Sequence, residues 1–281
     1  MKGIKRNMTN IDIAFCSDLI KTVGEQLLEI SRNGQRACNM QDMLERFEQS
    51  NTWANDKIRS TLAHEYPDIQ WLDIEFAREK PSEAPSQGDY WMCDPIDGAV
   101  QFMQGMPFWS TSLCLIHEGR PIFSLIYDPA QQELFIAREG AGAEGAKGAF
   151  LNGARIQVAR KQDLAQTFLA TAHPSLPERE MGDTVRTTQA IAHLLPQVLA
   201  VRMLGTVSLQ LAYVACGRLD GYWEYGNDTY DWLAGAFLVR EAGGVANNLA
   251  GQPFTWGSTG IIVGNAMIQS ALQAQLHEIM P

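Results

Sequence analysis

The chain has 281 residues, of which 46% are hydrophobic and 19% are charged, and its formal net charge is −10 at pH 7. This length and apolar content suffice for a large hydrophobic core, in one domain or in two closely packed ones. The acidic balance, without a basic patch or stripe, disfavours nucleic acid as a partner. No apolar run approaches the roughly 18 residues of a membrane-spanning helix, so we expect no membrane partner.

The cysteines and the N-terminus indicate the compartment. The five cysteines are widely scattered and form no Cys-x-x-Cys pair, which favours reduced thiols and argues against a zinc site. The N-terminus is basic but lacks the apolar segment of a secretory signal. We therefore expect a cytoplasmic protein.

The first half of the chain predicts helices followed by short strands. Apolar residues recur with a helical period over 10–33 and again over 53–66, where Pro67 ends the second helix. Residues 68–76 are expected to form a strand leading into a loop, and 81–88 form a connection rich in Pro, Ser and Gly. Three β-type runs then suit an antiparallel meander, at 110–117, 121–127 and 133–138.

From about residue 163 the predicted strands and helices alternate, which is the order of an α/β protein. Strands are expected at 167–172, 197–203 and 221–225, and helices at 182–194, 207–216 and 231–241. We therefore divide the chain into an N-terminal α+β domain, 1–160, with helices and an antiparallel sheet, and a C-terminal α/β domain, 161–281.

The stretch 91–99 carries the most chemistry. It begins as an apolar, aromatic run typical of a strand end, and Asp94 and Asp97 follow in a turn with Pro95 that Gly98 closes. Pro restricts the backbone and Gly permits conformations that other residues resist, so both carboxylates can converge. Two close carboxylates repel each other, and a hard divalent cation with oxygen ligands offsets that repulsion.

The turn also offers donors for an anion. The N–H groups of Gly98 and Ala99 can face an anion beside the metal, as turn amides do in phosphate sites. The alternative interpretation is a surface turn with two solvated acids. The spacing of the aspartates does not by itself distinguish such a turn from a metal site.

Two motifs resemble a known family. Asp94-Pro-Ile-Asp97-Gly98 resembles the DPIDG signature of the inositol monophosphatase family, the Mg2+-dependent, Li+-sensitive phosphomonoesterases. Far downstream, Tyr230-Asp231-Trp232 and the following 241–245 resemble the family's WDxAAG segment and EAGG turn. Shorter matches fall in family order at 105–108, 148–153 and 204–208. The resemblance covers the chain from about Tyr66 to its C-terminus.

The resemblance implies a layered αβαβα fold with a Mg2+ site between the two halves. Its metal ligands would be the carboxylates of Asp94, Asp97 and Asp231 and the backbone carbonyl of Ile96, and the three aspartates would be the catalytic residues. Gly98 and Ala99 would bind phosphate. Glu224, seven residues before Asp231, would bond the hydroxyls of the substrate, and Gly205 and Thr206 would lie in a loop beside it. On sequence alone, Asp231 could be only a helix N-terminal charge, and Glu224 only a solvated strand residue.

Three departures from the family pattern concern the metal that activates the attacking water. The principal glutamate of the family's GEE segment falls on Ile74, so Glu75 or Asp73 would have to replace it as a ligand. The threonine that ends the signature is Ala99, and the aspartate that partners this threonine is Asn51. Losing a charged ligand and a water-orienting hydroxyl together would cost several kcal/mol, where each ~1.36 kcal/mol is tenfold in rate.

Three functions follow from the resemblance. The first is Mg2+-dependent hydrolysis of a small phosphate monoester resembling inositol monophosphate, with weakened activity, by a protein that relatives suggest is a homodimer. The second is a catalytically degenerate member that binds a phosphorylated ligand or a protein partner. The third keeps catalysis and changes the substrate to a sugar bisphosphate or a 3′-phosphonucleotide.

Overall fold

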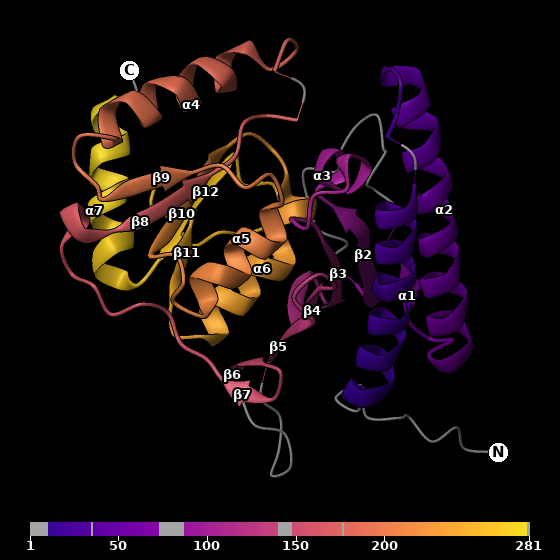
Figure 1. Cartoon of the computed structure of the whole chain (residues 1–281). Helices are drawn as coiled ribbons and strands as arrows, with labels where there is room; N and C mark the ends of the chain where they lie inside the picture. Colours follow the sequence, from indigo (N-terminus) through magenta and orange to yellow (C-terminus); the bar gives the residue numbers. More distant parts are fainter. Residues whose placement is uncertain (1–10, 35, 73–86, 140–147, 176, 280–281) are drawn as a thin grey trace.

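The structure is a computed structural model, and it describes residues 11–34, 36–72, 87–139, 148–175 and 177–279. Its elements stack in five layers, helices and sheets alternating (Figure 1). A helix pair, α1 and α2, covers one face of a seven-stranded sheet, and α5 and α6 lie between that sheet and a five-stranded one. The helices α4 and α7 cover the outer face of the second sheet. This arrangement confirms the predicted αβαβα fold.

The outer helix pair consists of α1 (Ile13–Asn33) and α2 (Met40–Glu65). The side chain of Asp12 accepts the N–H of Phe15 and caps α1. Asn39 does the same for α2, which therefore begins well before the predicted start at residue 53. The early turns of α2 carry apolar residues at helical spacing, at Met40, Met43, Leu44 and Phe47, and Met43 and Phe47 pack against the core although neither is fully buried. This helical period is present in the sequence and was not included in the prediction.

The seven-stranded sheet is antiparallel except for one parallel pair, β1 with β2. Its strands lie in chain order: β1 (Gln70–Trp71), β2 (Asp89–Asp97), β3 (Ser110–His117), β4 (Arg120–Asp128), β5 (Glu133–Arg138), β6 (Gly148–Leu151) and β7 (Ala154–Arg155). The predicted meander of three strands is thus confirmed at its centre. A short helix, α3 (Ala99–Gln104), follows β2 directly and was not predicted.

The five-stranded sheet has the order β11-β12-β10-β8-β9. Its strands are β8 (Phe168–Thr171), β9 (Ala200–Arg202), β10 (Gly221–Tyr225), β11 (Val245–Asn247) and β12 (Gly260–Gly264). The helices of this half are η1 (Leu164–Gln166), α4 (Met181–Leu194), α5 (Val207–Ala215), α6 (Thr229–Glu241) and α7 (Ala266–Glu278). The strands β8, β9 and β10 are parallel, as their alternation with helices predicts.

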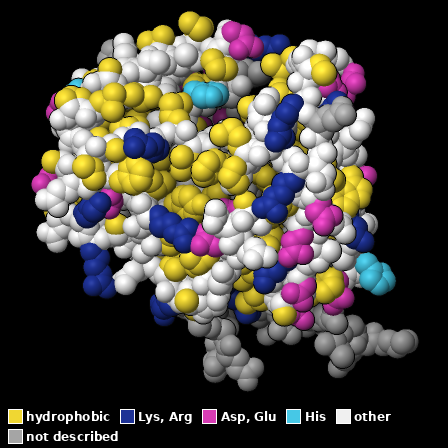
Figure 2. All heavy atoms as spheres, in the orientation of Figure 1, with side chains coloured by type: hydrophobic (Ala, Val, Ile, Leu, Met, Phe, Trp, Pro, Cys, Tyr) yellow, Lys and Arg dark blue, Asp and Glu magenta, His cyan; other side chains and the backbone are white. Residues whose placement is uncertain are grey.

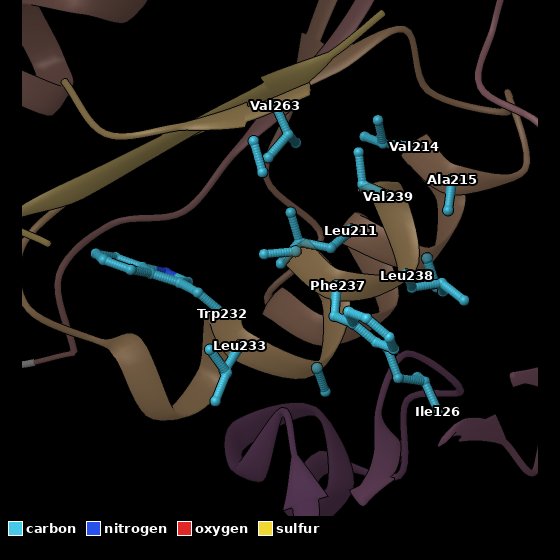
Figure 3. Packing of buried hydrophobic residues seen from close by; sticks show 14 of the residues in the cluster. Ile126, Leu211, Val214, Ala215, Trp232, Leu233, Phe237, Leu238, Val239 and Val263 are labelled. Atoms are coloured by element: carbon cyan, nitrogen blue, oxygen red, sulfur yellow. The ribbon is translucent and has the colours of Figure 1, made fainter. Parts of the chain in front are cut away.

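The middle layer joins both halves of the molecule. Figure 3 shows Val263 of β12 on one side of α5 and α6 and Ile126 of β4 on the other. The two helices approach so closely that a Cβ at Gly235 would lie 2.4 Å from the Cβ of Leu211. Because α5 and α6 contact both sheets, the division into two domains at residue 160 stays a prediction. None of the described helices is long and apolar enough to cross a membrane.

Candidate active site

The first two aspartates lie in strand β2, not in the turn that the sequence suggested. Asp94 pairs with Ser112 of β3 and Asp97 pairs with Ser110, so β2 contains one extra residue between them. This is a β-bulge, and the hydroxyl of Thr111 stabilises it by donating to the carbonyl of Pro95 at 2.8 Å. Pro is tolerated at bulges because it lacks the N–H that a regular ladder needs.

The bulge decides where the carboxylates point. Residues three apart in a regular strand face opposite sides of the sheet. Ser110 and Ser112 are two apart on β3 and share a face, and directly paired residues lie on the same side. Asp94 and Asp97 therefore face the same side of the sheet. The backbone beyond them reverses at Gly98, whose φ of 97° is one that favours glycine.

Asp97 is buried against the first turn of α5. Its Oδ1 accepts the N–H of Val207 at 3.1 Å, and its Oδ2 accepts the N–H of Ser208 at 2.7 Å. Two hydroxyls also donate to Oδ2, from Thr206 at 2.7 Å and from Ser208 at 2.5 Å. A carboxylate at a helix N-terminus satisfies donors that the helix itself leaves free. The predicted loop residue Thr206 is thus placed beside Asp97.

The hydroxyl of Ser110 completes this cluster. Its Oγ lies 3.0 Å from the Oγ of Ser208 and 3.3 Å from the Oγ1 of Thr206, and all three side chains are buried. Ser110 lies opposite Asp97 on β3, so the cluster draws on β2, β3 and α5. Buried hydroxyls of this kind are stable only when they are hydrogen-bonded to one another or to a charge.

Asp231 lies in the first turn of α6 and is partly exposed. Burial raises the pKa of Tyr222 on β10, and the charge and hydrogen bond of Glu224 and the charges of Asp97 and Asp231 act in the same direction. Burial also raises the pKa of Asp97, against the effect of its four donors. Bringing ionised carboxylates together away from water is unfavourable unless a cation offsets their charge.

Glu224 lies inside the protein, 2% exposed, and not on the solvated surface of a strand. Its Oε2 accepts the hydroxyl of Tyr222 and the indole N–H of Trp232, both at 2.5 Å. Burial raises the pKa of Glu224 to about 8, and the charges of Asp228 and Asp97 act in the same direction. At neutral pH this carboxyl group therefore carries its proton for most of the time.

The remaining predicted residues fall in three places. Ala99 begins α3 and Gly98 precedes it, with Thr206 nearby, since a Cβ at Gly98 would lie 3.2 Å from the Cβ of Thr206. Gly205 is exposed and lies under Gln101 of α3, whose amide would meet a Cβ there. Ile96 is buried in the bulge and donates its N–H to the Oδ1 of Asp94 at 3.0 Å.

Of the three positions that depart from the family pattern, the structure describes Ala99 and Asn51 but not Ile74. Asn51 is buried within α2, in the layer behind the seven-stranded sheet. Asp73, Ile74 and Glu75 lie outside the described residues, so the replacement of the missing metal ligand by Glu75 stays a prediction.

Four side chains that contact the predicted residues were not identified from the sequence: Ser110, Ser208, Tyr222 and Trp232. Each of the four is buried and carries a side-chain group that can donate a hydrogen bond. A polar side chain at a position that the pattern assigns to the core is the available signal, because such a residue needs a buried partner.

Comparisons with known proteins identify the family. A model of the inositol monophosphatase family matches residues 5–281. The chain belongs to this family. An inositol-1-monophosphatase of Mesorhizobium japonicum is 35% identical over 182 residues, which are 65% of this chain and 65% of that one. The Nus factor SuhB of Escherichia coli is 33% identical over 196 residues, 70% of each chain. The solved IMPase of Thermotoga maritima is 26% identical, with a TM-score of 0.77 over 95% of this chain and 96% of that one.

Membership of this family raises the question of whether the residues fit Mg2+. Asp94, Asp97 and Asp231 offer only oxygen donors, which is the chemistry that Mg2+ prefers. Within the described part of the chain, no three His, Cys, Asp or Glu side chains are arranged so that they could together hold a metal ion. Mg2+ rarely uses such a cage, since it keeps several waters and binds one or two carboxylates together with substrate phosphate. The residues therefore fit an ion whose coordination water and a phosphate ester complete.

Proposed function

We propose that this protein hydrolyses a small phosphate monoester of the inositol monophosphate type in the presence of Mg2+. The observation that supports this most is the bulge in β2, which places Asp94 and Asp97 on the face of the sheet that meets α5. The relatives that are named as inositol-1-monophosphatases support the same activity.

Different groups of the site would bind the metal ion and the phosphate. The carboxylate ligands of Mg2+ would come from Asp94, Asp97 and Asp231, with the carbonyl of Ile96, and water and the phosphate of the substrate would complete the coordination. When bound, this ion neutralises the phosphate charge and lowers the pKa of a bound water. The amides of Gly98 and Ala99 orient the phosphate oxygens and stabilise the charge that develops on them.

The chemistry of Ala99 sets the rate. A methyl group neither accepts nor donates a hydrogen bond, so this side chain cannot orient the attacking water as a hydroxyl does. Positioning of reactants is a large part of phosphoryl-transfer catalysis. We therefore expect slow turnover.

The test is phosphate release from myo-inositol 1-phosphate while Mg2+ is raised from zero to saturation, beside an Asp94→Asn control. Turnover that depends on Mg2+ and is lost in the control supports the proposal. A sugar bisphosphate and a 3′-phosphonucleotide in the same assay distinguish the substrate classes. If none of these esters is hydrolysed faster than by the control, the hydrolase proposal is wrong.

A second candidate function is binding without turnover. Two observations favour it: the loss of the hydroxyl at Ala99 and the similarity to proteins named Nus factor SuhB. The partner would then be a phosphorylated ligand or another protein. Calorimetric titration with myo-inositol 1-phosphate and Mg2+ separates the two functions, since binding with no phosphate release supports the second.

Exposed apolar side chains favour a homodimer. Figure 2 shows hydrophobic side chains gathered across the middle of one face. Val100, Met106 and Phe108 are exposed on α3 and the loop after it, and Met203 is exposed on the loop before α5. Exposed large apolar side chains are frequent at protein interfaces. Light scattering after size exclusion should give twice the chain mass, and Met106→Glu should shift it towards the monomer. A monomeric wild type would refute the dimer.

A further inference from the structure

Two glutamine side chains hold the loop before α5. The amide nitrogen of Gln101, on α3, donates to the carbonyl of Leu204 at 3.4 Å. The side chain of Gln210, which is fully buried on α5, accepts the N–H of Leu204 at 3.2 Å and donates to the carbonyl of Thr206 at 2.9 Å. Both backbone polar groups of Leu204 are therefore bonded to side chains, and these side chains come from two different helices.

Gly205 forms the tip of this loop, between the two bonded residues, and it is exposed. Its φ of 90° lies in the left-handed region that favours glycine. A Cβ at this position would overlap the amide of Gln101, so the glutamine lies directly against the backbone of the loop. Glycine is therefore needed here both for the turn and for the close approach of Gln101. The tip of the loop consequently presents peptide groups and no side chain.

The loop lies beside the turn to which we assign phosphate binding. A Cβ at Gly98 would lie 3.2 Å from the Cβ of Thr206, and the hydroxyl of Thr206 donates to Asp97. Gln101 follows Gly98 by three residues within α3, so the same short helix begins at the turn and bonds the loop. An ester whose phosphate is held at this turn lies next to the loop, and the loop is placed to contact its alcohol part.

We propose that Gln101 and Gln210 are positioning residues, which hold the backbone of the loop 204–206 against the alcohol part of a phosphate ester bound at Gly98. This inference rests on the proposed function. Peptide N–H and C=O groups bond hydroxyls, so the loop favours esters whose alcohol carries further hydroxyls. Because the two glutamines order the loop before the ester binds, less conformational entropy is lost on binding and the affinity for such esters is higher.

The test compares three variants on two esters, myo-inositol 1-phosphate and methyl phosphate, whose alcohol has no further hydroxyl. Gln101→Ala removes the bond from α3, and Gln210→Met removes both bonds from α5 while keeping the length of the side chain. Gln104→Ala is the matched control, because it makes the same change at an exposed position of the same helix. We expect the first two variants to raise KM for myo-inositol 1-phosphate by about three- to tenfold, the effect of about one hydrogen bond, with kcat within about twofold.

Three further results are expected. KM for methyl phosphate and the calorimetric affinity for Mg2+ with inorganic phosphate should stay within about twofold of the wild type, because neither ligand has an alcohol that bonds the loop. Hydrogen exchange at the N–H of Leu204 should be about tenfold or more faster in Gln210→Met, which removes its acceptor, and also faster in Gln101→Ala. Gln104→Ala should match the wild type in every measurement.

A merely structural role would give a different pattern. Equal losses on the two esters, an unchanged KM for myo-inositol 1-phosphate, or unchanged exchange at Leu204 would each overturn the positioning role. If the wild type binds the esters but hydrolyses neither, the proposed hydrolysis fails, and calorimetric affinities for the two esters then replace KM in the same comparison. A wild type that binds neither ester would overturn the inference as well. Gln101→Ala changes a half-buried side chain, so it serves if Gln210→Met does not fold.

Discussion

Replacing Asp97 by asparagine removes one charge and one acceptor from a buried group with four donors. The carboxylate accepts two backbone N–H groups, from Val207 and Ser208, and two hydroxyls, from Thr206 and Ser208. The asparagine oxygen fits best at the position of Oδ2, where three donors meet. The amide nitrogen then faces the N–H of Val207, and two donors cannot bond each other.

The cost follows from these contacts. A buried N–H left without an acceptor costs about 1–3 kcal/mol. The charge lost from the N-terminus of α5 adds about 1 kcal/mol. Burial of the charged carboxylate is unfavourable and raises its pKa. Replacing it by a neutral amide therefore offsets part of these two costs. We expect a net loss of about 1–3 kcal/mol in the free energy of unfolding.

The assay is thermal unfolding near neutral pH without added metal. A chain of 281 residues has an unfolding entropy of about 0.6 kcal/mol per kelvin, so Tm should fall by about 2–5 °C. Asp163→Asn is the control, because it removes the charge of an exposed residue whose side chain accepts a single backbone N–H. Its Tm should change by about 1 °C or less. An unchanged or higher Tm for Asp97→Asn would refute the view that this carboxylate ties α5 to β2.

Other perturbations test the rate, the packing and the pH dependence. Ala99→Thr restores a hydroxyl beside Gly98 and should raise kcat about tenfold or more in the phosphate-release assay; no gain with Mg2+ bound would mean that the missing hydroxyl does not limit the rate. Gly235→Ala, which forces its Cβ against Leu211, should destabilise by about 1–3 kcal/mol in urea unfolding. The matched change in α4, Gly182→Ala, meets no atom closer than 3.6 Å and should not destabilise. Glu224 has its pKa raised to about 8, so the folded state holds a proton that the unfolded state releases. Stability should fall as pH rises from about 5 to 8, by up to about 1.4 kcal/mol per unit, and Glu224→Gln should flatten this slope; equal slopes would contradict the raised pKa.

The elements that were predicted correctly are those whose own residues show a hydrophobic pattern. The strand β3 contains the apolar run 113–116, and its predicted bounds, 110–117, match the structure. The helix α1 keeps an apolar stripe along its length, and its prediction was also correct. The first turns of α2 were missed although Met40, Met43, Leu44 and Phe47 keep a helical spacing, and α3 was missed because six residues are too few to show a period.

The site was predictable as a set of residues but not as a geometry. Asp94, Pro95 and Gly98 carry the composition of a turn, and the sequence was interpreted in that way. The structure has a bulge there because of the pairing with Ser110 and Ser112, and pairing between strands leaves no mark within either strand alone. For the same reason the burial of Glu224 was missed, since its partner Trp232 belongs to the next helix.

The tie between Asp97 and α5 also constrains how this chain can be recombined with its relatives. A chimera that joins residues 1–160 of this protein to the second half of another family member keeps Asp97 but inherits foreign residues at positions 206 and 208. If those residues lack hydroxyls, the buried carboxylate loses two of its four donors at the junction. Each loss of such a charge-assisted bond costs about 1.5–3 kcal/mol. Shuffled libraries should therefore accept crossovers near residue 160 only when Thr206 and Ser208 travel with Asp97, so these three positions are inherited as one unit although they lie far apart in the chain.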